Sequence, residues 1–401
     1  MSEAAFAGVK VLEQCELVSG PYCAKLLADL GAETIKIEKP KTGDEARRRG
    51  PFLHDIPHPE RSGLFLYLNT NKLGITLNLE TSTGKRLFAE LVKNTDILVE
   101  DTAPGTMERL GLGYDTLSEV NPSLIMTSIT PYGQTGPYRG YKAHHLNIYH
   151  ISGQAHFSYT EKRRPNEPPS RGGGYIGDYD AGLSGAVATV AALYRRNLSG
   201  IGQHIDVSKE EALISLDRVD IGTFTNDGVA AMKRRRGMLG GLMPCKDGYV
   251  IIVAPQQHQW EALVKLMGNP EWAQGEKCKD EFVRAENADE LQPLIEEWML
   301  QHTRDEIYHW GQGFSCPVGA VNSAADVLNS PQMNERGFFV EIDHPEAGKL
   351  KYPSAAYKFS ETPWRVGRTA PLLGEYNSEV YCGRLGYSTE DLAEMKASGI
   401  I

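Results

Sequence analysis

The first 130 residues alternate short apolar segments with amphipathic ones, and this alternation restricts the fold more than any other feature of the sequence. Segments typical of strands stand at 9–12, 34–37, 75–79, 96–99 and 124–126. Segments with helical spacing of apolar residues, such as 83–93, separate them. A strand, a crossover helix and a second strand form a βαβ unit whose strands run parallel. The sequence therefore predicts an α/β domain of Rossmann-like type with an open parallel sheet.

The chain has 401 residues, which is too many for one ordinary core. The composition changes after Gly228, where a basic, glycine-rich loop precedes a strand at 249–253 and helical segments over about 257–308. From about 330 the chain is rich in strands and loops again. We expect a large domain made of residues 1–224 and 330–401, with residues 225–329 inserted as a smaller α+β domain.

The composition excludes several classes of protein. Apolar residues make up 41% and charged residues 23%, which is typical of a globular chain and not of a disordered one. A net charge of -10 makes the chain a poor general binder of nucleic acid or anionic membranes. No apolar run is long enough to span a bilayer, and the start of the chain lacks the pattern of a signal peptide. The six cysteines show no CxxC spacing, so we expect no metal site and a cytoplasmic location.

Two acidic residues, Asp178 and Asp180, stand between Gly177 and Gly182 just before a helix of small residues over 181–196. An aspartate at a helix start accepts backbone N–H bonds, and we assign that capping role to Asp180. The flanking glycines let a ligand come close to the backbone. The positive end of the helix would keep Asp178 ionised and therefore nucleophilic.

A pair of histidines and a run of basic residues are further candidates for a functional role. His144 and His145 titrate near neutral pH and are therefore candidates for proton transfer. The basic run at 233–236 is either a solvated face or, beside its glycine-rich loop, a site for an anionic substrate.

Several segments taken together resemble the class III CoA-transferases, the family of formyl-CoA, carnitine and bile-acid CoA-transferases. They are Gly20-Pro21, 30–38, 43–44, 69–72, 104–111, Gly177-Asp178 and 370–375, and the resemblance runs from about residue 6 to residue 392. It implies a Rossmann-like large domain built from both chain ends and a smaller inserted domain. It also implies an interlocked dimer, either a homodimer or a heterodimer with a paralogous subunit.

The resemblance also implies a site. The family's nucleophilic aspartate, four positions before a glycine, corresponds to Asp178. The family's coenzyme A contacts correspond to Lys39, Lys72, Arg109 and Lys142. Backbone N–H groups near Gly177, or in the loop that includes Gly240 and Gly241, are candidates to stabilise oxyanions. Coenzyme A enters as a thioester substrate, and neither a permanently bound cofactor nor a metal is implied.

The implied reaction moves coenzyme A from an acyl-CoA donor to a free carboxylic acid through a mixed anhydride and an aspartyl-CoA thioester. Arg48, with its neighbours at 47 and 49 and the arginines at 234–236, is a candidate to hold the second carboxylate of a dicarboxylic acid. Succinyl-CoA is then a candidate donor, and benzylsuccinate a candidate acceptor. Formyl-CoA-type members carry glutamine where this chain has Val18, which argues against a formyl or oxalyl substrate.

Two alternatives stay open. An α-methylacyl-CoA racemase or epimerase shares the fold and would use His144 with Asp178 as its two bases. The segment 69–72 favours a transferase over a racemase. A subunit that only binds coenzyme A and supports an active paralogue is the second alternative, and the presence of Asp178 argues against it.

Overall fold

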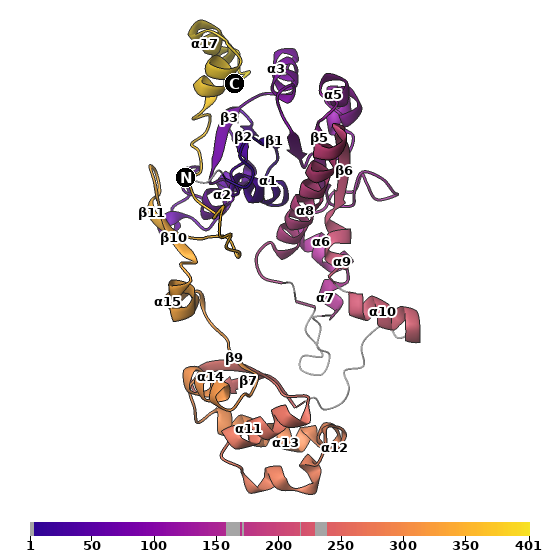
Figure 1. The fold of residues 1–401 in the computed structure, drawn as a ribbon, viewed down its shortest axis with the longest axis vertical. Helices are drawn as coiled ribbons and strands as arrows, with labels where there is room; N and C mark the ends of the chain where they lie inside the picture. Colours follow the sequence, from indigo (N-terminus) through magenta and orange to yellow (C-terminus); the bar gives the residue numbers. More distant parts are fainter. Residues whose placement is uncertain (1–3, 158–168, 171, 217, 229–238) are drawn as a thin grey trace. The chain divides into compact units, whose positions relative to one another are not determined.

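Figure 1 shows the chain as a computed structural model that describes residues 4–157, 169–170, 172–216, 218–228 and 239–401. The chain divides into two compact units. Unit 1 consists of Met1–Arg218 and Phe338–Ile401, and unit 2 consists of Val219–Gly337. The sequence places these limits at 224 and 329, so unit 2 takes in a few more residues on either side.

A six-stranded sheet with all neighbouring strands parallel forms the centre of unit 1, in the order β3-β2-β1-β4-β5-β6. The strands are β1 (Lys10–Gln14), β2 (Glu33–Glu38), β3 (Lys72–Thr76), β4 (Ile97–Glu100), β5 (Ile125–Thr130) and β6 (Gln203–Ser208). The predicted α/β fold with an open parallel sheet is confirmed. Residues 203–208 form the sixth strand, which is not among the strands predicted from the sequence, and a helix begins directly after it at Lys209.

Helices cover both faces of this sheet. They are α1 (Ser19–Ala28), α2 (Gly63–Leu68), α3 (Ser82–Val92), α4 (Thr106–Leu110), α5 (Tyr114–Val120), α6 (His145–Ile151), α7 (Gln154–Phe157), α8 (Ile176–Ser199) and α9 (Lys209–Ile214), with short η1 (Glu45–Arg48) and η2 (Leu53–Asp55). Successive strand residues point to opposite faces. Leu12 therefore packs in the core with α3 and α5, and its neighbour Val11 packs in the core with α1 and α8. Burial on both faces explains why β3, β4 and β5 are buried along their whole length.

Helices α1 and α8 pack closely because α8 carries glycine where they meet. A Cβ atom on Gly182 would lie 2.6 Å from the carbonyl oxygen of Ser19, and one on Gly185 would lie 2.9 Å from Ile129. Only a residue without a side chain fits such spacing. The small residues of α8 thus bring the start of α1 against the first turns of α8.

The C-terminal part of the chain completes unit 1. It contains the antiparallel pair β10 (Phe339–His344) and β11 (Gly348–Pro353), the π-type segment η5 (Ser378–Arg384) and α17 (Thr389–Ala397). The hydroxyl of the fully buried Tyr381 donates to the carbonyl of Thr76 at 2.8 Å. The backbone N–H of Asn78 donates to the carbonyl of Ile400 at 2.7 Å. Both ends of the chain therefore build the same core.

Unit 2 has a core of its own. The antiparallel strands β7 (Gly240–Cys245), β8 (Gly248–Val253) and β9 (Val318–Ala320) lie in the order β7-β8-β9. The helices are α11 (Gln257–Leu266), α12 (Glu281–Glu286), α13 (Ala288–Met299), α14 (Arg304–Gly313), α15 (Ala324–Asn329) and α16 (Pro331–Glu335), with η3 (Glu271–Gln274) and η4 (Glu276–Cys278). Helix α10 (Arg218–Asp227) contains the limit between the units. Met243, Ile252 and Ile295 are fully buried in this second core.

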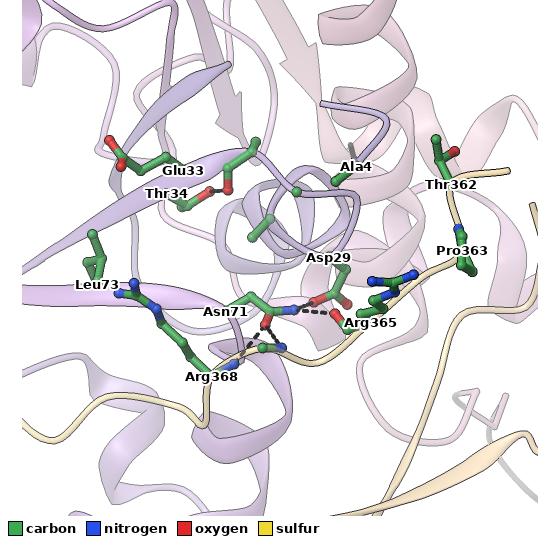
Figure 2. Close-up of a pocket in the computed structure, with 14 residues that line it drawn as sticks. Ala4, Asp29, Glu33, Thr34, Asn71, Leu73, Thr362, Pro363, Arg365 and Arg368 are labelled. Atoms are coloured by element: carbon green, nitrogen blue, oxygen red, sulfur yellow. Dashed lines mark hydrogen bonds between the residues drawn. The ribbon is translucent and has the colours of Figure 1, made fainter. Parts of the chain in front are cut away.

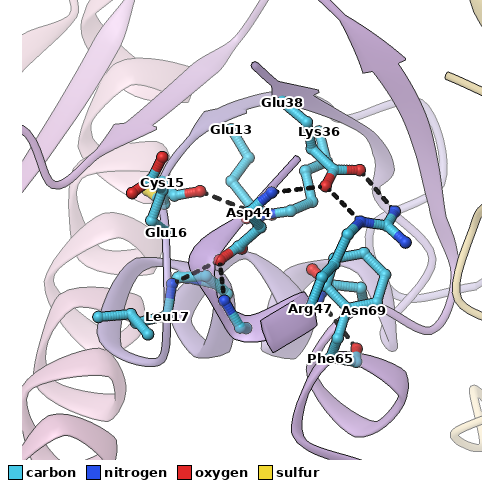
Figure 3. A network of polar contacts seen from close by, with 12 residues as sticks. Glu13, Cys15, Glu16, Leu17, Lys36, Glu38, Asp44, Arg47, Phe65 and Asn69 are labelled. Atoms are coloured by element: carbon cyan, nitrogen blue, oxygen red, sulfur yellow. Dashed lines mark hydrogen bonds and ion pairs between the residues drawn. The ribbon is translucent and has the colours of Figure 1, made fainter. Parts of the chain in front are cut away.

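A buried cluster of charges, shown in Figure 3, lies beside the first two strands of unit 1. The ammonium of Lys36 contacts Glu13 at 2.7 Å and Asp44 at 2.8 Å. Arg47 binds Glu38 with two hydrogen bonds of 2.7 Å, and its guanidinium lies 3.7 Å from the ring centre of Phe65. Burial disfavours the ammonium of Lys36, but the surrounding carboxylates outweigh it and raise the pKa of Lys36 well above its usual value.

Within the residues that the structure describes, no helix combines the length and apolar character needed to cross a bilayer.

Candidate active site

Polar side chains gather at the edge of the sheet where the parallel strands end, here called the carboxyl edge. Ser19 begins α1 after β1, Asp101 follows β4, and Lys209 follows β6. Asp178 lies in the first turn of α8. The last turn of α8 leads into the start of β6, so the helix runs from the carboxyl edge to the opposite edge, and its first turn lies at the carboxyl edge. Ligands of open α/β sheets bind at this edge.

The carboxylate of Asp178 is almost entirely buried and is held at one oxygen. Its Oδ1 accepts a hydrogen bond from the Ser19 hydroxyl at 3.0 Å and contacts the Lys209 ammonium at 2.8 Å. The Asp178 side chain is 9% exposed and that of Lys209 is 20% exposed. The Lys209 ammonium and the positive end of α8 thus both lie beside this buried carboxylate.

Lys209, like Ser19, is a site residue that sequence reasoning missed. A signal for it was present, because Ser208-Lys209-Glu210-Glu211 places Lys209 between a strand end and a capped helix start. The Ser208 side chain accepts from the backbone N–H of Glu211, which fixes the first turn of α9. A residue at the end of a parallel strand is a candidate for the site on topological grounds alone.

The loop before Ser19 is fixed by two carboxylates. Leu17 has a φ of 65°, and its N–H donates to Asp44 Oδ1 at 2.9 Å. The N–H of Glu16 donates to both oxygens of Asp101, at 3.0 and 3.2 Å. Burial raises the pKa of Asp101 well above its usual value, although Lys209 and the Glu16 N–H act in the opposite direction. These contacts hold the strained turn that presents Ser19 to Asp178.

The two histidines differ in their relation to Asp178. His145 Nδ1 lies 3.7 Å from Asp178 Oδ2, and the imidazole packs between Tyr149 and Tyr175 at ring distances of 6.1 and 5.9 Å. His144 is exposed at the start of α6, where its N–H donates to Asn147 Oδ1 at 3.0 Å. The structure brings His145, not His144, beside the carboxylate.

Asp180 does not cap α8. The helix begins at Ile176 after Tyr175, so both acidic residues lie inside it. Asp180 is half-buried, and burial raises the pKa of its carboxyl. The expected capping role is therefore wrong, because α8 starts one turn earlier than the small-residue pattern indicates.

Three of the four predicted coenzyme A contacts are exposed cations beyond strand ends. Lys39 follows β2 and pairs with Glu16 at 2.7 Å, and Arg109 follows β4 and lies 3.6 Å from Glu80. Lys142 lies in the exposed segment after β5.

Lys72 does not fit the predicted contact with coenzyme A. It is fully buried in β3, where its ammonium contacts Glu13 at 2.6 Å and donates to the carbonyl of Pro21 at 2.8 Å. Burial lowers the pKa of Lys72 to about 8, although Glu13 acts in the opposite direction. Its partners make it part of the buried charge cluster, so no phosphate can replace them without unpairing Glu13.

The other predicted residues are spread over the two units. Gly177 lies in the first turn of α8, where a Cβ would come within 2.7 Å of Leu213. Gly240 and Gly241 open strand β7 in unit 2. Arg48 is exposed and donates to the carbonyl of Thr42 at 2.8 Å, whereas Arg47 is fully buried and unsuited to bind a substrate. The basic run 233–236 lies outside the described residues.

A cavity of about 370 Å³ lies at the opposite edge, where the strands begin, and not at Asp178 (Figure 2). Asn71 stands in its wall, donating to Asp29 Oδ1 at 2.7 Å and accepting from the N–H of Gly367 at 2.7 Å. Lys25 already neutralises Asp29 at 2.8 Å. We attribute this cavity to the docking of the C-terminal segment against α1.

Among the described residues, no group of three or more histidine, cysteine, aspartate or glutamate side chains is arranged to hold a metal ion. The groups that the structure brings together at Asp178 are its carboxylate, the Ser19 hydroxyl, the Lys209 ammonium and the His145 imidazole.

Comparison with known proteins gives consistent matches over almost the whole chain. The model of CoA-transferase family III matches residues 6–377. The formyl-CoA:oxalate CoA-transferase of Streptomyces avermitilis is 31% identical, with 99% of each chain covered. The beta subunit of the succinyl-CoA–L-malate CoA-transferase of Chloroflexus aurantiacus is also 31% identical, with 98% of each chain covered. A crystal structure of a CAIB/BAIF family protein from Brucella suis has a TM-score of 0.84 and 28% identity, covering 95% of this chain and 99% of that one.

Proposed function

This chain belongs to CoA-transferase family III and is a CoA-transferase, and on this premise we propose that Asp178 is its covalent nucleophile. The observation that carries the proposal is the buried carboxylate at the carboxyl edge, held by Ser19 and Lys209 at 3.0 and 2.8 Å. It combines a cationic partner with a fixed position, and both suit a carboxylate that accepts an acyl group.

The reaction proceeds in four exchanges at carbonyl carbons. The Asp178 carboxylate attacks the donor thioester, the C–S bond breaks, and a mixed anhydride and coenzyme A thiolate result. The thiolate attacks the aspartyl carbonyl and releases the donor acid as a carboxylate, leaving an aspartyl-CoA thioester. The acceptor carboxylate then attacks this thioester and releases the thiolate, which finally takes the acyl group from the new anhydride. Each bond formed replaces one of similar energy, and Asp178 is regenerated.

Coenzyme A brings several phosphate charges into an acidic protein, so its binding needs local cations. We assign this role to Lys39, Arg109 and Lys142. All three are exposed, and each follows the end of a different parallel strand, at the carboxyl edge where Asp178 also lies.

For the acids, we propose succinyl-CoA as the donor and a dicarboxylic acid as the acceptor. Two relatives bear names with a dicarboxylic acid, oxalate in one and L-malate in the other, and one of them names succinyl-CoA. Arg48 is exposed in η1, and its guanidinium suits a second carboxylate. The aromatic side chains of Tyr149 and Tyr175 beside His145 suit an acid with a bulky substituent, of which benzylsuccinate is one example. A panel of donors and acceptors, read by mass spectrometry of the coenzyme A esters formed, tests this assignment.

The geometry of the site does not favour the racemase alternative. It needs a second base opposite Asp178, and the residue chosen for that role, His144, lies exposed at the start of α6. A racemase would introduce solvent deuterium at the α carbon of a 2-methylacyl-CoA without any free acid. We expect no such exchange, and we expect turnover to depend on an added carboxylic acid.

We further propose that the chain works as a dimer, with a second copy or with a paralogous subunit. Helix α8 carries a row of exposed apolar side chains at helical spacing, at Leu183, Val187, Val190, Tyr194 and Leu198. Val187 is 63% exposed and Tyr194 and Leu198 are each 70% exposed, which is unusual for the central helix of a domain. One relative is named as a subunit, which supports an assembly of this kind.

The covalent role of Asp178 is tested by substitution and by trapping. Asp178→Asn and Asp178→Ala should abolish transfer while the far-UV circular dichroism spectrum stays unchanged, because no other carboxylate shares its contacts. Wild-type enzyme incubated with succinyl-CoA, then denatured and digested, should carry a coenzyme A adduct, or its hydroxylamine product, on the peptide with Asp178.

Asp180→Asn is the matched control, since it changes a carboxylate on the same peptide that makes none of these contacts. It should keep transfer activity and the adduct. An adduct on Asp180, on Cys245 or on no residue would sink the proposed mechanism.

A further inference from the structure

The two oxygens of Asp178 have different surroundings. Oδ1 receives the Ser19 hydroxyl at 3.0 Å and the Lys209 ammonium at 2.8 Å. Oδ2 has the imidazole Nδ1 of His145 at 3.7 Å, beyond hydrogen-bond length. The carboxylate is thus held by Oδ1 and leaves Oδ2 as the oxygen less engaged by donors, so Oδ2 is the better placed nucleophile.

This asymmetry matters because two of the four exchanges take place at the carbonyl carbon of Asp178 itself. When the thiolate attacks the aspartyl anhydride, and when the acceptor carboxylate attacks the aspartyl thioester, the aspartyl carbon becomes tetrahedral. Its carbonyl oxygen then carries the negative charge until the leaving group departs. If Oδ2 forms the bond to the acyl group, Oδ1 is that oxygen throughout.

We propose that Ser19 and Lys209 form the oxyanion site of the aspartyl carbonyl and keep Oδ1 as the carbonyl oxygen, while only Oδ2 exchanges with the substrates. The inference rests on Asp178 being the nucleophile. The donors stand 2.8 and 3.0 Å from Oδ1, within the range that stabilises an oxyanion without reorganisation. One donor is charged, which strengthens its contact as the oxyanion develops.

The positions of both donors are fixed by their supports. Ser19 is fully buried, and the turn before it is held by Asp44 and Asp101 through the N–H groups of Leu17 and Glu16. Lys209 is the first residue of the capped helix α9.

An isotope experiment follows the two oxygens separately. An acceptor acid with ¹⁸O in both carboxylate oxygens attacks the aspartyl thioester, and one ¹⁸O becomes the bridging oxygen of the anhydride. When the thiolate takes the acyl group, this ¹⁸O stays on Asp178 as a carboxylate oxygen. After several turnovers with succinyl-CoA and labelled succinate, wild-type Asp178 should therefore carry one ¹⁸O and not two, as read by mass spectrometry of its peptide.

Loss of the donors should remove this selectivity. In Lys209→Met and Ser19→Ala the carboxylate can rotate between turnovers, so doubly labelled Asp178 should accumulate after the same number of turnovers. Lys93→Met is the matched control, because Lys93 is exposed at the end of α3, at the opposite edge of the sheet. It should show a single ¹⁸O. Double labelling of the wild type at the same rate as the variants would overturn the proposal.

The rates give a second readout. Lys209→Met should slow the conversion of anhydride into aspartyl-CoA thioester by about 10²- to 10³-fold in rapid-quench experiments, the usual cost of losing one oxyanion donor. Lys209→Arg should recover part of this rate. If wild-type Asp178 carries no adduct at all, the nucleophile assignment itself fails. If the adduct forms but Lys209→Met reacts at the wild-type rate, only the oxyanion assignment fails.

Discussion

Arg47 illustrates how a residue that looks suited to substrate binding can be wholly structural. Its guanidinium is fully buried and donates two hydrogen bonds of 2.7 Å to Glu38 (Figure 3). It also donates one of 3.0 Å to the carbonyl of Pro371. Arg47→Met would leave Glu38 buried without a cation, so we expect the free energy of unfolding to fall by about 3–5 kcal/mol. Urea unfolding followed by circular dichroism measures this change.

Arg49→Met provides the comparison two residues away. Arg49 pairs with Glu45 at the surface, with 49% of its side chain exposed. An exposed pair of this kind contributes about 0–1 kcal/mol, because water already solvates both charges. Equal losses in the two variants would contradict the structural role of Arg47.

The exposed cations Lys39, Arg109 and Lys142 should act on coenzyme A and not on the acid. Replacing any one with alanine should raise the KM for the acyl-CoA donor, at a cost of about 1.5–3 kcal/mol of binding free energy, with little change in kcat. Steady-state kinetics with donor and acceptor varied in turn would separate the two effects. Lys93→Ala, at the opposite edge of the sheet, should leave both KM values unchanged, and an unchanged donor KM in all three variants would refute the assignment.

At the residue scale, the sequence predicted Asp178 but not its partners. The choice between His144 and His145 depends on where α6 begins, and adjacent helical residues point about 100° apart, so a shift of one residue redirects the side chain. Lys209 is 31 residues from Asp178 in the chain, and only the parallel sheet brings its strand end to the site. The local pattern at 208–211 can mark Lys209 as a candidate, but its pairing with Asp178 is set by tertiary structure.

At the scale of elements, the contact between α1 and α8 links stability to catalysis. Gly182→Ala would place a Cβ 2.6 Å from the carbonyl oxygen of Ser19 and 3.2 Å from the Tyr22 side chain, so α1 must move. We expect a loss of about 1–3 kcal/mol in stability. Activity should fall at temperatures where the variant is still fully folded, because Ser19 shifts away from Asp178. Thermal unfolding and transferase assays on the same samples measure both effects.

Gly222→Ala is the corresponding control in a helix. Gly222 lies in α10, and a Cβ there would meet no atom within 4 Å. Alanine is the better helix former by up to about 1 kcal/mol, so this variant should be as stable as the wild type or slightly more stable. A Gly182→Ala enzyme that behaves like Gly222→Ala would show that the two helices tolerate a wider spacing.

The elements were predictable wherever apolar periodicity was strong. Strands β1, β2 and β4 and helix α3 follow directly from their sequence patterns. Strand β6 is absent from the predicted strands, although residues 203–208 alternate polar and apolar side chains as a half-buried strand does. The strand lies at the edge of the sheet, where the apolar signal is weakest.

At the scale of the whole molecule, both ends of the chain build unit 1, and unit 2 is inserted between them. The change in composition near residue 228 and the strand- and loop-rich pattern from about 330 led to the expectation that the chain returns to its first domain, and the resemblance to a known family implied the same. The contacts that hold this return, such as Tyr381 with Thr76 and Ile400 with Asn78, join positions about 300 residues apart. No local pattern could predict these pairs.

The apolar row on α8 leads to a prediction about assembly. Burying Val187, Tyr194 and Leu198 against a second subunit would remove a continuous apolar surface from water, a favourable contribution of about 25 cal/mol per Å². The purified chain should therefore have a mass in solution close to twice the 44.3 kDa of one chain, as measured by light scattering after gel filtration. Introducing charge with Val187→Asp and Tyr194→Asp together should shift the mass to that of one chain or prevent assembly.

A control variant and a contrary outcome test the prediction of a dimer formed through α8. Val120 is 41% exposed at the end of α5, away from α8, so Val120→Asp should leave the mass of the assembly unchanged. If the wild-type chain has the mass of a single copy at micromolar concentration, a homodimer is ruled out. The apolar row would then have to be covered by a paralogous subunit, and activity would appear only after that subunit is added. If the wild type is a dimer that the double substitution leaves intact, the interface lies elsewhere on unit 1 or on unit 2.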